Sequence, residues 1–324
     1  MKIGVFGGTF NPPHQGHLAA ARTAISALGL DKLLIIPAAI PPHKELPEGT
    51  PAPEHRLAMA EKMADALLLP DVAAASGLEL HRTGKSYTSD TLERLREQYP
   101  DDELWLLMGT DMFLTLHLWH KPETILKLAG VCAFGRSEQD TEEVFAPQRE
   151  HLQKTFPGAK ITIITLPGLV DISSTRMREL LAGGEGEEYL YPAVYGYILM
   201  HGLYGVRADL KRLDIPELRA CSYSMVMQKR VRHIRGTEEE AVRLARRWGA
   251  NENYARRAGI LHDCTKYLSG GEHIAICEKY GVPLDELERK AAKLLHSKTG
   301  ACIARHVFGE PDEVYEAIFW HTTA

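Results

Sequence analysis

The distribution of apolar residues changes once along this chain of 324 residues, close to residue 205. Before that point, short and almost continuous apolar runs alternate with amphipathic segments, which predicts strands alternating with helices. Strands that lack a polar face are typical of a parallel sheet covered by helices on both sides. We therefore predict an α/β first domain with a Rossmann-like, doubly wound parallel sheet. The expected strands are Ile3–Phe6, Leu33–Pro37, Leu104–Gly109, Val131–Phe134 and Ile161–Leu166.

The other segments have helical periodicity, and after Tyr204 we find no alternation typical of strands. In the first part, helices are expected at Leu18–Leu28, which precedes Gly29, and at His55–Leu69, which precedes Pro70. Because only helical patterns follow Tyr204, we predict an all-α second domain. Its expected helices are Glu238–Trp248, Asn253–His262, Glu272–Tyr280, Leu284–His296, Thr299–Phe308 and Asp312–His321.

Length and composition agree with two ordinary globular domains. A chain of this size usually forms two domains, and 44% hydrophobic with 25% charged residues is typical of soluble proteins. The charged segment 205–219, which contains Pro216, is the expected boundary. The predicted domains are therefore residues 1–206 and 207–324.

Charge and cysteine content narrow the function classes. The net charge of −5 gives no global basic field for nucleic acid. The sequence starts without a charged-then-apolar leader, and no apolar run is long enough to span a bilayer. Free thiols in a reducing cytoplasm are expected, because the five cysteines are scattered without a CxxC pair. We expect small-molecule substrates and neither nucleic acid nor membrane as partners, and a homo-oligomer stays open. The cysteines are Cys132, Cys221, Cys264, Cys277 and Cys302.

The segment GVFGGTFNPPHQGHL near the N-terminus predicts a phosphate site. It reads as a strand, a glycine-rich turn, two histidines and a helix. Gly7 and Gly8 lack a Cβ and let the backbone approach a phosphate closely. The helix that begins near His17 offers free N–H groups and the positive end of its dipole, and His14 lies three residues before it. The alternative is a tight turn that carries two surface histidines.

A second candidate phosphate element is the segment 171–178, DISSTRMR, which follows the last expected strand. Ser173 is a natural helix N-cap, so the segment is by itself compatible with an ordinary capped helix. Together with the two histidines, its hydroxyl groups and Arg178 are expected to form the opposite wall of a triphosphate site. No GxxxxGK[ST] segment is present, which excludes a P-loop nucleotidase.

The second domain carries a different set of polar residues at helix ends. His262 and Asp263 end one expected helix, and the other three members of the set are His233, His296 and His321. Neutral imidazole and carboxylate are ligands that iron and manganese accept, and one carboxylate is able to bridge two metal ions. The alternative is a group of packed or surface histidines.

Three further polar residues of the second domain lie outside this set of candidate metal ligands. Lys266 shares a helical face with Asp263, so it is predicted either to bind a phosphate or to form an i,i+3 ion pair. His273 and His306 have no motif around them and are predicted to be surface residues.

Read together, GGTFNPPHQGH and ISSTRMR resemble the HxGH nucleotidyltransferase superfamily. The segments IPPHK, EHR, SYTSDTL, GTD, WH and HGLY narrow the resemblance to bacterial nicotinate-nucleotide adenylyltransferases over roughly residues 1–205. The resemblance implies transfer of AMP from ATP to nicotinate mononucleotide, with Mg²⁺ accompanying ATP. The nearest alternative is phosphopantetheine adenylyltransferase, which is not expected to carry the PPHK, SYT and Trp119 features.

The resemblance also implies roles for individual residues. His14, His17, Lys44 and Arg178 are the expected catalytic phosphate contacts, and Lys44 has the alternative of a solvated loop lysine. The implied ATP-binding set is Gly7, Gly8, Thr9, Phe10, His14, His17, Gly109, Asp111, Ile172, Ser173, Ser174, Thr175 and Arg178.

For the acceptor, the resemblance implies that Trp119 stacks on the pyridine ring and that backbone N–H groups near Tyr87 and Thr88 bind the carboxylate. Trp119 has the alternative of a core residue and Asp111 that of a helix cap. Arg56 and Arg136 are weaker candidates, because surface ion pairs would explain them equally well.

In the second domain, HIRGTEEEA, GILHDCTK, LLHSKTG and WHTT resemble the HD phosphohydrolase superfamily from about Lys229 onward. The branch that it resembles hydrolyses diadenosine tetraphosphate symmetrically to ADP with a di-iron centre. Such enzymes supply a further aspartate after the last histidine, and none follows His321. The chain is therefore either a fragment or an incomplete site, in which case the domain is a non-catalytic nucleotide-binding or oligomerising module.

Overall fold

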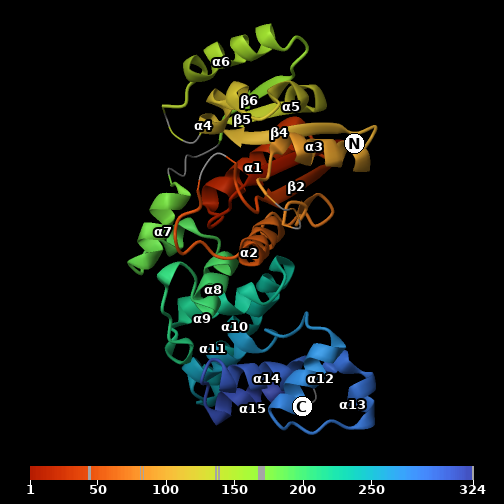
Figure 1. Cartoon of the computed structure of the whole chain (residues 1–324). Coiled ribbons are helices and arrows are strands. Elements are labelled where there is room, and N and C mark those ends of the chain that lie inside the picture. Colours follow the sequence, from red (N-terminus) through yellow and green to blue (C-terminus); the bar gives the residue numbers. More distant parts are fainter. Residues whose placement is uncertain are drawn as a thin grey trace. The chain divides into compact units, whose positions relative to one another are not determined.

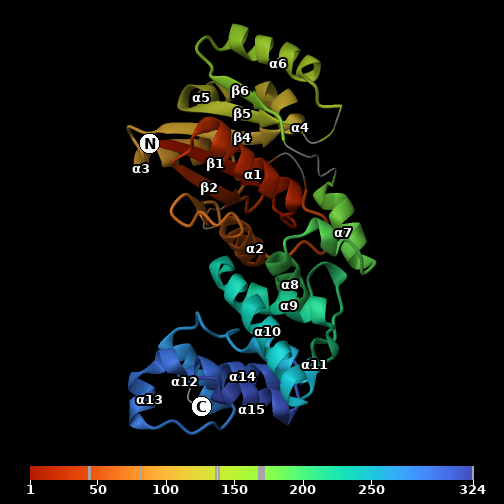
Figure 2. The ribbon, with the colours of Figure 1, turned by 180° about the vertical axis from the view of Figure 1, so that it is seen from behind.

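The computed structural model describes residues 1–42, 45–80, 82, 84–135, 137, 139–166 and 172–322. These residues form two compact units, Met1–Tyr191 and Pro192–Ala324. Figures 1 and 2 show strands only in the first unit and helices throughout the second. The predicted succession of an α/β domain and an all-α domain is therefore confirmed.

The first unit is built on a six-stranded sheet in the order β3-β2-β1-β4-β5-β6. All five strand pairs are parallel. Five strands match the predicted ones within a few residues, whereas β3 was missed because three alanines give no apolar run. The strands are β1 (Lys2–Gly8), β2 (Lys32–Pro37), β3 (Ala73–Ala75), β4 (Glu103–Gly109), β5 (Ala129–Phe134) and β6 (Ile161–Ile164).

Helices cover both faces of this sheet, as expected for strands without a polar side. One face packs on α1 and α2 through residues such as Ala21 and Met63. The other face packs on α3 to α6 through residues such as Leu92, Phe113 and Phe145. The helices of this unit are α1 (Gln15–Leu28), α2 (Pro53–Asp65), α3 (Thr88–Gln98), α4 (Thr110–Leu114), α5 (Pro122–Leu128), α6 (Glu142–Thr155) and α7 (Ser174–Ala182).

One helix of the first unit is shorter than predicted. The apolar pattern predicted a helix as far as Leu69, but α2 ends at Asp65. Leu68 lies in the left-handed region at φ 59°, so the chain turns several residues before Pro70.

The described residues of the second unit form helices joined by loops, and none of them forms a strand. The predicted helix Leu284–His296 is wrong: α13 stops at Lys290, and a separate 3₁₀ turn spans Ala292–Leu295 before α14. The first predicted helix also starts earlier, at Gln228. The helices are α8 (Pro192–His201), α9 (Ile215–Ser224), α10 (Gln228–Trp248), α11 (Glu252–Leu261), α12 (Gly270–Lys279), α13 (Glu286–Lys290), α14 (His296–His306) and α15 (Asp312–Trp320).

The compact units divide at Tyr191, earlier than the predicted division after residue 206. The reason is that α8 packs closely on α9. A Cβ at Gly196 would lie 1.9 Å from the carbonyl oxygen of Ala220, so only glycine permits this approach. In the packing of the fold, α8 therefore belongs with the helical unit.

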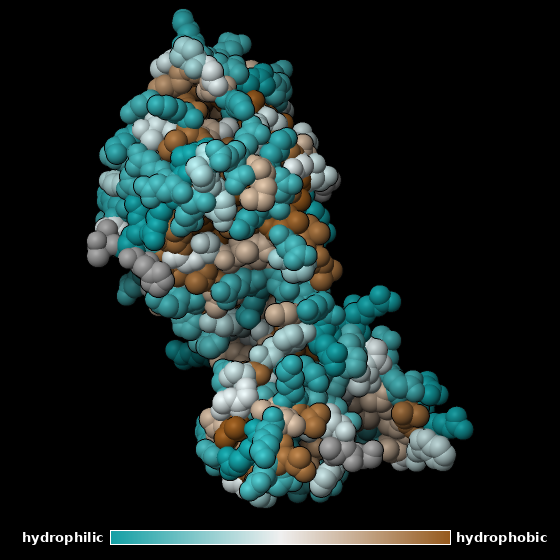
Figure 3. Space-filling view, turned by 90° about the vertical axis from the view of Figure 1, so that its right-hand side faces the viewer, coloured by the Kyte–Doolittle hydropathy of each residue, from teal (hydrophilic) through white to brown (hydrophobic). Residues whose placement is uncertain are grey.

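Two further predictions concern the whole chain. All five cysteines are free, as predicted, and all of them are buried. Across the described residues, no helix combines the length and the apolar character that crossing a membrane requires. On the face drawn in Figure 3, hydrophilic residues cover most of both units and apolar residues form scattered patches.

Candidate active site and metal centre

The glycine-rich turn lies where the strand order of the first sheet reverses. β1 pairs with β2 on one side and with β4 on the other. Phe6 is level with Leu107, and both strands end two residues later, at Gly8 and Gly109. In open parallel sheets, ligands bind beyond the carboxyl ends of the strands at such a switch point. The space beside Gly7 is open, because no described atom lies within 4 Å of the position of an added Cβ.

His14 and His17 lie together at the start of α1. Their ring centroids are 3.9 Å apart, and the ring of Phe10 packs 5.2 Å from that of His17. His14 is the N-cap of α1, and its backbone N–H donates to Nδ1 of His17 at 3.3 Å. Because Nδ1 of His17 accepts this bond, Nε2 carries the proton of the neutral ring.

The second phosphate element meets the glycine-rich turn from α7. Ser173 caps α7 by accepting from the backbone N–H of Arg176 at 3.1 Å, as predicted. Arg178 donates to the carbonyl oxygen of Asn11 at 2.9 Å, and the hydroxyl of Ser174 lies 3.4 Å from the carbonyl of Pro12. The two predicted walls are therefore adjacent, and Arg178 holds the turn in place.

Ile172 joins the same site. It lines a small cavity together with residues from the turn, from α1 and from the end of β5. The lining is His14, Gly16, His17, Ala19, Phe134, Leu166 and Ile172.

Arg56 lies in the interior and not at the surface, where ion pairs were considered for it. Its side chain is fully buried, at 0% exposure. The guanidinium donates to the carbonyl oxygens of Thr9 at 3.0 Å, Ala38 at 2.5 Å and Ala39 at 3.0 Å. Arg56 therefore fastens the glycine-rich turn to the segment after β2. The EHR segment alone did not reveal this role, because its carbonyl partners are distant in sequence.

The residues expected to bind the acceptor come from two segments that the fold brings together. Tyr87 is the N-cap of α3, and its ring lies 4.3 Å from that of His120. Trp119, next to His120, is half-buried and packs against the sheet. Thr88 is the first residue of α3, where backbone N–H groups have no partner within the helix. Asp111 is exposed in the first turn of α4, whose N-cap is Gly109, so Asp111 is not a cap.

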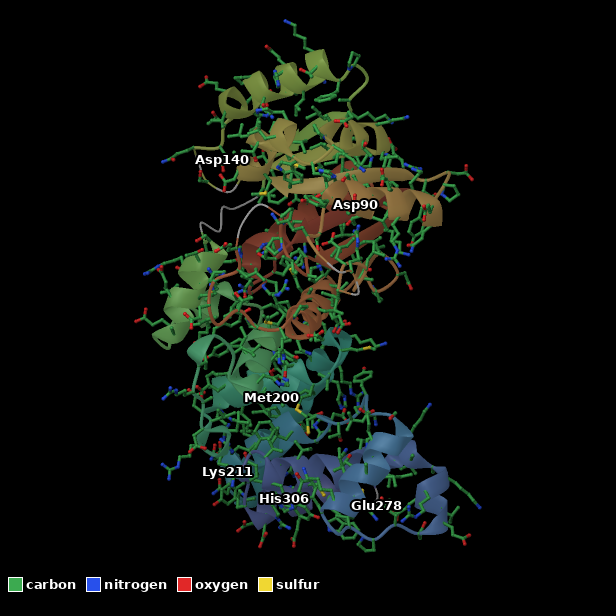
Figure 4. The ribbon with its side chains drawn as sticks, viewed as in Figure 1. Asp90, Asp140, Met200, Lys211, Glu278 and His306 are labelled. Carbon is green, nitrogen blue, oxygen red and sulfur yellow. The ribbon has the colours of Figure 1, made fainter. Side chains whose placement is uncertain are left out.

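Sequence reasoning missed a buried polar network beside this segment. Thr91 donates to Glu79 at 2.6 Å, and Arg82 donates to Thr91 at 3.2 Å and to Asp90 at 3.0 Å. Burial raises the pKa of Glu79, although the hydrogen bond from Thr91 and the charge of Arg82 oppose that shift. Asp90 is labelled on α3 in Figure 4. The sequence signal for this network was the presence of Glu79 and Arg82, three residues apart, shortly before the SYT segment.

Some predicted site residues lie outside the part of the chain that the structure describes. These are Lys44, Arg136 and Asp171. Their roles stay predictions.

In the second unit, the five predicted metal ligands lie together, with the four histidines gathered around the carboxylate of Asp263. Nε2 of His233 and Nε2 of His262 are 3.0 Å apart, and each lies within 3.4 Å of Oδ2 of Asp263. Nε2 of His296 lies 3.4 Å from Oδ1 of the same carboxylate. Two ligand sets result, His233–His262–Asp263 and Asp263–His296–His321, and the ligand atoms of each set lie within 4.8 Å of one another.

Hydrogen bonds orient three of these histidines for metal binding. Nδ1 of His262, His296 and His321 lies 2.8, 2.9 and 2.6 Å from the carbonyl oxygen three residues earlier. A carbonyl only accepts, so Nδ1 is the donor and Nε2 keeps its lone pair. Backbone carbonyls orient metal-binding histidines in this way in known metal sites.

The charges in this cluster also fit a metal ion. Oδ1 of Asp263 is buried and has no hydrogen-bond partner among the described residues. Burial alone would raise the pKa of Asp263, but the guanidinium of Arg230, which donates to Oδ2, holds it well below its usual range. Desolvation lowers the pKa of His296 to about 4 and lowers the pKa of His321. A carboxylate and neutral imidazoles are the protonation states that bind first-row metals.

Two cations border the cluster. Nε of Arg230 donates to Oδ2 of Asp263 at 2.6 Å, a contact that sequence reasoning missed. Nζ of Lys266 lies 4.0 Å from Oδ1 of Asp263 and 3.0 Å from Nε2 of His296. The i,i+3 ion pair considered for Lys266 is thus present at its outer limit. Both cations line a cavity of about 690 Å³ beside the carboxylate.

His273 is not the surface residue that was predicted. It is 2% exposed, and its Nδ1 lies 2.9 Å from the hydroxyl of Thr299. That hydroxyl is also 2.9 Å from the hydroxyl of Thr265, so the three side chains join α12 to α14 beside the cluster. His306, labelled in Figure 4, is exposed as predicted.

Comparison with known families agrees with this division. Residues 5–180 match the family model described as cytidylyltransferase-like, and residues 230–324 match that of the HD domain. The chain belongs to the cytidylyltransferase-like family and carries an HD domain after the matching segment.

Within that family, the first part of the chain groups with nicotinate-nucleotide adenylyltransferases. It is 39% identical over 216 residues to a probable enzyme of this name from Trichlorobacter lovleyi, covering 63% of this chain and 99% of that protein. A second relative, from Carboxydothermus hydrogenoformans, is 37% identical over 204 residues, covering 63% of this chain and 98% of its own length.

A solved structure supports the fold of the same region. The nicotinic acid mononucleotide adenylyltransferase of Plasmodium falciparum matches with a TM-score of 0.52 at 18% identity. The match covers 64% of this chain and 98% of the solved one.

Proposed function

We propose that the chain transfers the adenylyl group of ATP to nicotinate mononucleotide. The observation that carries this proposal is the histidine pair at the start of α1, set at the switch point of the sheet and bordered by Arg178 of α7. The similarity of 63% of the chain to proteins named probable nicotinate-nucleotide adenylyltransferases supports the choice of acceptor.

In the proposed reaction, a phosphate oxygen of nicotinate mononucleotide forms a bond to the α-phosphorus of ATP, and pyrophosphate leaves. The attacking group is already an anion, so the protein needs mainly to align the reactants and to stabilise charge. His14, His17, Lys44 and Arg178 do this by binding phosphate oxygens. Mg²⁺ enters with ATP as the counterion of its phosphates.

For the acceptor, we propose that the ring of Trp119 stacks on the pyridine and that Asp111 lies near a ribose. Backbone N–H groups at the start of α3, near Tyr87 and Thr88, bind the nicotinate carboxylate. The contact between the rings of Tyr87 and His120 supports this assignment, because it places the SYT and WH segments side by side.

A pyrophosphate-release assay tests the acceptor. The full chain is given ATP with nicotinate mononucleotide, with its nicotinamide form or with phosphopantetheine. We expect the highest kcat/KM with nicotinate mononucleotide. A preference for phosphopantetheine would overturn the proposal and favour the alternative transferase.

We further propose that the HD domain hydrolyses diadenosine tetraphosphate to ADP. The observation that favours hydrolysis over mere nucleotide binding is the presence of two ligand sets that share Asp263. The four histidines and Asp263 would hold a pair of divalent metal ions, for which we propose iron, and such a pair supplies charge stabilisation for phosphoryl transfer to water. Arg230 and Lys266 bind the phosphate chain.

Metal analysis combined with a hydrolase assay tests this second activity. We expect about two equivalents of iron or manganese per chain in the loaded protein and ADP as the product. Protein that stays metal-free and inactive after loading would instead support a nucleotide-binding or oligomerising module.

For the functional domains we keep the boundary between residues 1–206 and 207–324. The reason is that the curated relatives match 63% of the chain, which is more than the first compact unit, Met1–Tyr191, contains.

A further inference from the structure

The cavity beside Asp263 has two chemically different regions. One region contains the histidine cluster with Arg230 and Lys266. The other is a wall of apolar side chains that no assigned role uses. The wall residues are Ala241, Leu244, Ala245, Trp248, Ala250, Ala255 and Ala258.

Helical spacing explains how the wall continues from the cluster. Arg230, His233, Thr237, Leu244 and Trp248 all belong to α10 and all line the cavity. Their spacings of three, four, seven and four residues keep them on one face of the helix. From His233 to Leu244 the helix rises roughly 16 Å, at 1.5 Å per residue. A diphosphate followed by a ribose and a base spans a path of this kind.

The wall exposes large apolar groups that a folded protein usually covers. Trp248 is 75% exposed and Leu244 is 41% exposed. The guanidinium of Arg247 lies 5.3 Å from the centre of the Trp248 ring, which leaves an aromatic surface with positive charge beside it. Such a surface favours a flat, electron-rich ring attached to an anion.

We propose that Leu244 and Trp248 form the nucleoside subsite of the HD domain. The base of a nucleoside diphosphate, or of each half of a dinucleoside tetraphosphate, stacks against this wall while its phosphates lie along Arg230 and Lys266. Charge complementarity selects this occupant, because the ligand has to join an anionic chain to an apolar ring. A cavity of about 690 Å³ is in the range that holds ligands of this size. The inference rests on the phosphohydrolase function proposed above.

Tryptophan fluorescence of the full chain tests the subsite without requiring turnover. The chain, loaded with Mn²⁺, is titrated with ADP and separately with inorganic pyrophosphate. The difference between the wild type and Trp248→Phe isolates the signal of Trp248 from the other tryptophans and from nucleotide bound in the first unit. We expect ADP, but not pyrophosphate, to change this difference signal.

Substitutions then measure the contribution of the wall. Base stacking on an aromatic side chain is lost in Trp248→Ala, so we expect KM for diadenosine tetraphosphate and the inhibition constant of ADP to rise about tenfold. Leu244→Ala should also raise both constants, whereas Trp248→Phe should retain most of the affinity for ADP. Inhibition by pyrophosphate should not change in any of these variants. Leu287→Ala, which changes an exposed leucine of α13 outside the cavity, is the matched control.

The outcomes separate the two proposals. An unchanged difference signal at saturating ADP, or equal ADP inhibition in the wild type, Trp248→Ala and Leu244→Ala, overturns the subsite. If ADP changes the signal of Trp248 but diadenosine tetraphosphate is not hydrolysed, the subsite stands and the hydrolase proposal fails.

Discussion

The two candidate sites are built in opposite ways. In the first unit, a backbone turn is held by hydrogen bonds from Arg56 and Arg178 to carbonyl oxygens. In the second unit, imidazole and carboxylate side chains converge on one point, and Oδ1 of Asp263 has no hydrogen bond from any described residue. The described part of the first arrangement is fixed by hydrogen bonds to backbone carbonyls, whereas the second has converging donors that a cation would satisfy. The comparison teaches that a resident metal should matter to one site only.

The largest expected effect is that of removing the shared carboxylate. Asp263→Ala deletes a ligand from both sets, so we expect metal binding to be lost and hydrolysis of diadenosine tetraphosphate to fall by about a thousandfold or more. Adenylyl transfer should be unchanged. Metal analysis and the two assays on one preparation measure this. Asp312→Ala, which changes an exposed aspartate of the same unit, is the control; equal metal content in both variants would contradict the assignment.

A smaller but still large effect is expected from His17 in the first unit. If His17 binds the phosphates as proposed, His17→Ala removes a hydrogen-bond donor, so kcat for adenylyl transfer should fall by about 10²–10³-fold. Affinity for nicotinate mononucleotide and the hydrolase rate should change little. Steady-state kinetics with His151→Ala, an exposed histidine of α6, as the control distinguish the two effects. Nearly intact turnover in His17→Ala would refute the phosphate role.

Arg56 tests whether the first site depends on its backbone clamp. Arg56→Lys keeps the charge but cannot reach three carbonyl oxygens, so we expect about 2–3 kcal/mol less unfolding free energy for the first unit. KM for ATP should rise, because Thr9 is no longer held. Denaturant titrations and kinetics measure both. The control is Arg176→Lys, an exposed arginine paired with Glu179, and equal behaviour of the two variants would refute the clamp.

The smallest effect concerns Glu79, whose pKa is raised by burial. The contribution of the protonated group to stability is fully present below the ordinary carboxyl pKa and is lost as pH rises through the raised folded pKa. Glu79→Gln keeps the accepting oxygen for Thr91 and does not titrate. Its unfolding free energy should therefore depend less on pH in that range. Thermal melts across that range test this, and parallel curves for the two proteins would refute it.

The sequence predicted local features better than long-range contacts. The cap at Ser173 follows from spacing within one turn, and it is present. The burial of Arg56 and His273 was missed, because their partners are carbonyls and hydroxyls from distant segments. A lone polar residue gives no signal of such a partner.

Periodicity also has clear limits at the level of elements. It identified five of the six strands, but Ala73–Ala75 is too small and too short to stand out. It predicted one helix over Leu284–His296, although α13 ends at Lys290 and a separate 3₁₀ turn follows. The division at Tyr191 depends on the close approach of Gly196 to α9, which only the tertiary structure reveals.

The central claim is that only the second site depends on a resident metal. In the most direct measurement, the full chain is treated with a chelator and the chelator is then removed. Both reactions are assayed in the same sample with Mg²⁺. Histidine-rich sites bind Mg²⁺ poorly, so adenylyl transfer should be fully active while hydrolysis of diadenosine tetraphosphate is lost and returns with Fe²⁺ or Mn²⁺. Loss of both reactions together, or retention of hydrolysis in the metal-free chain, would contradict the account.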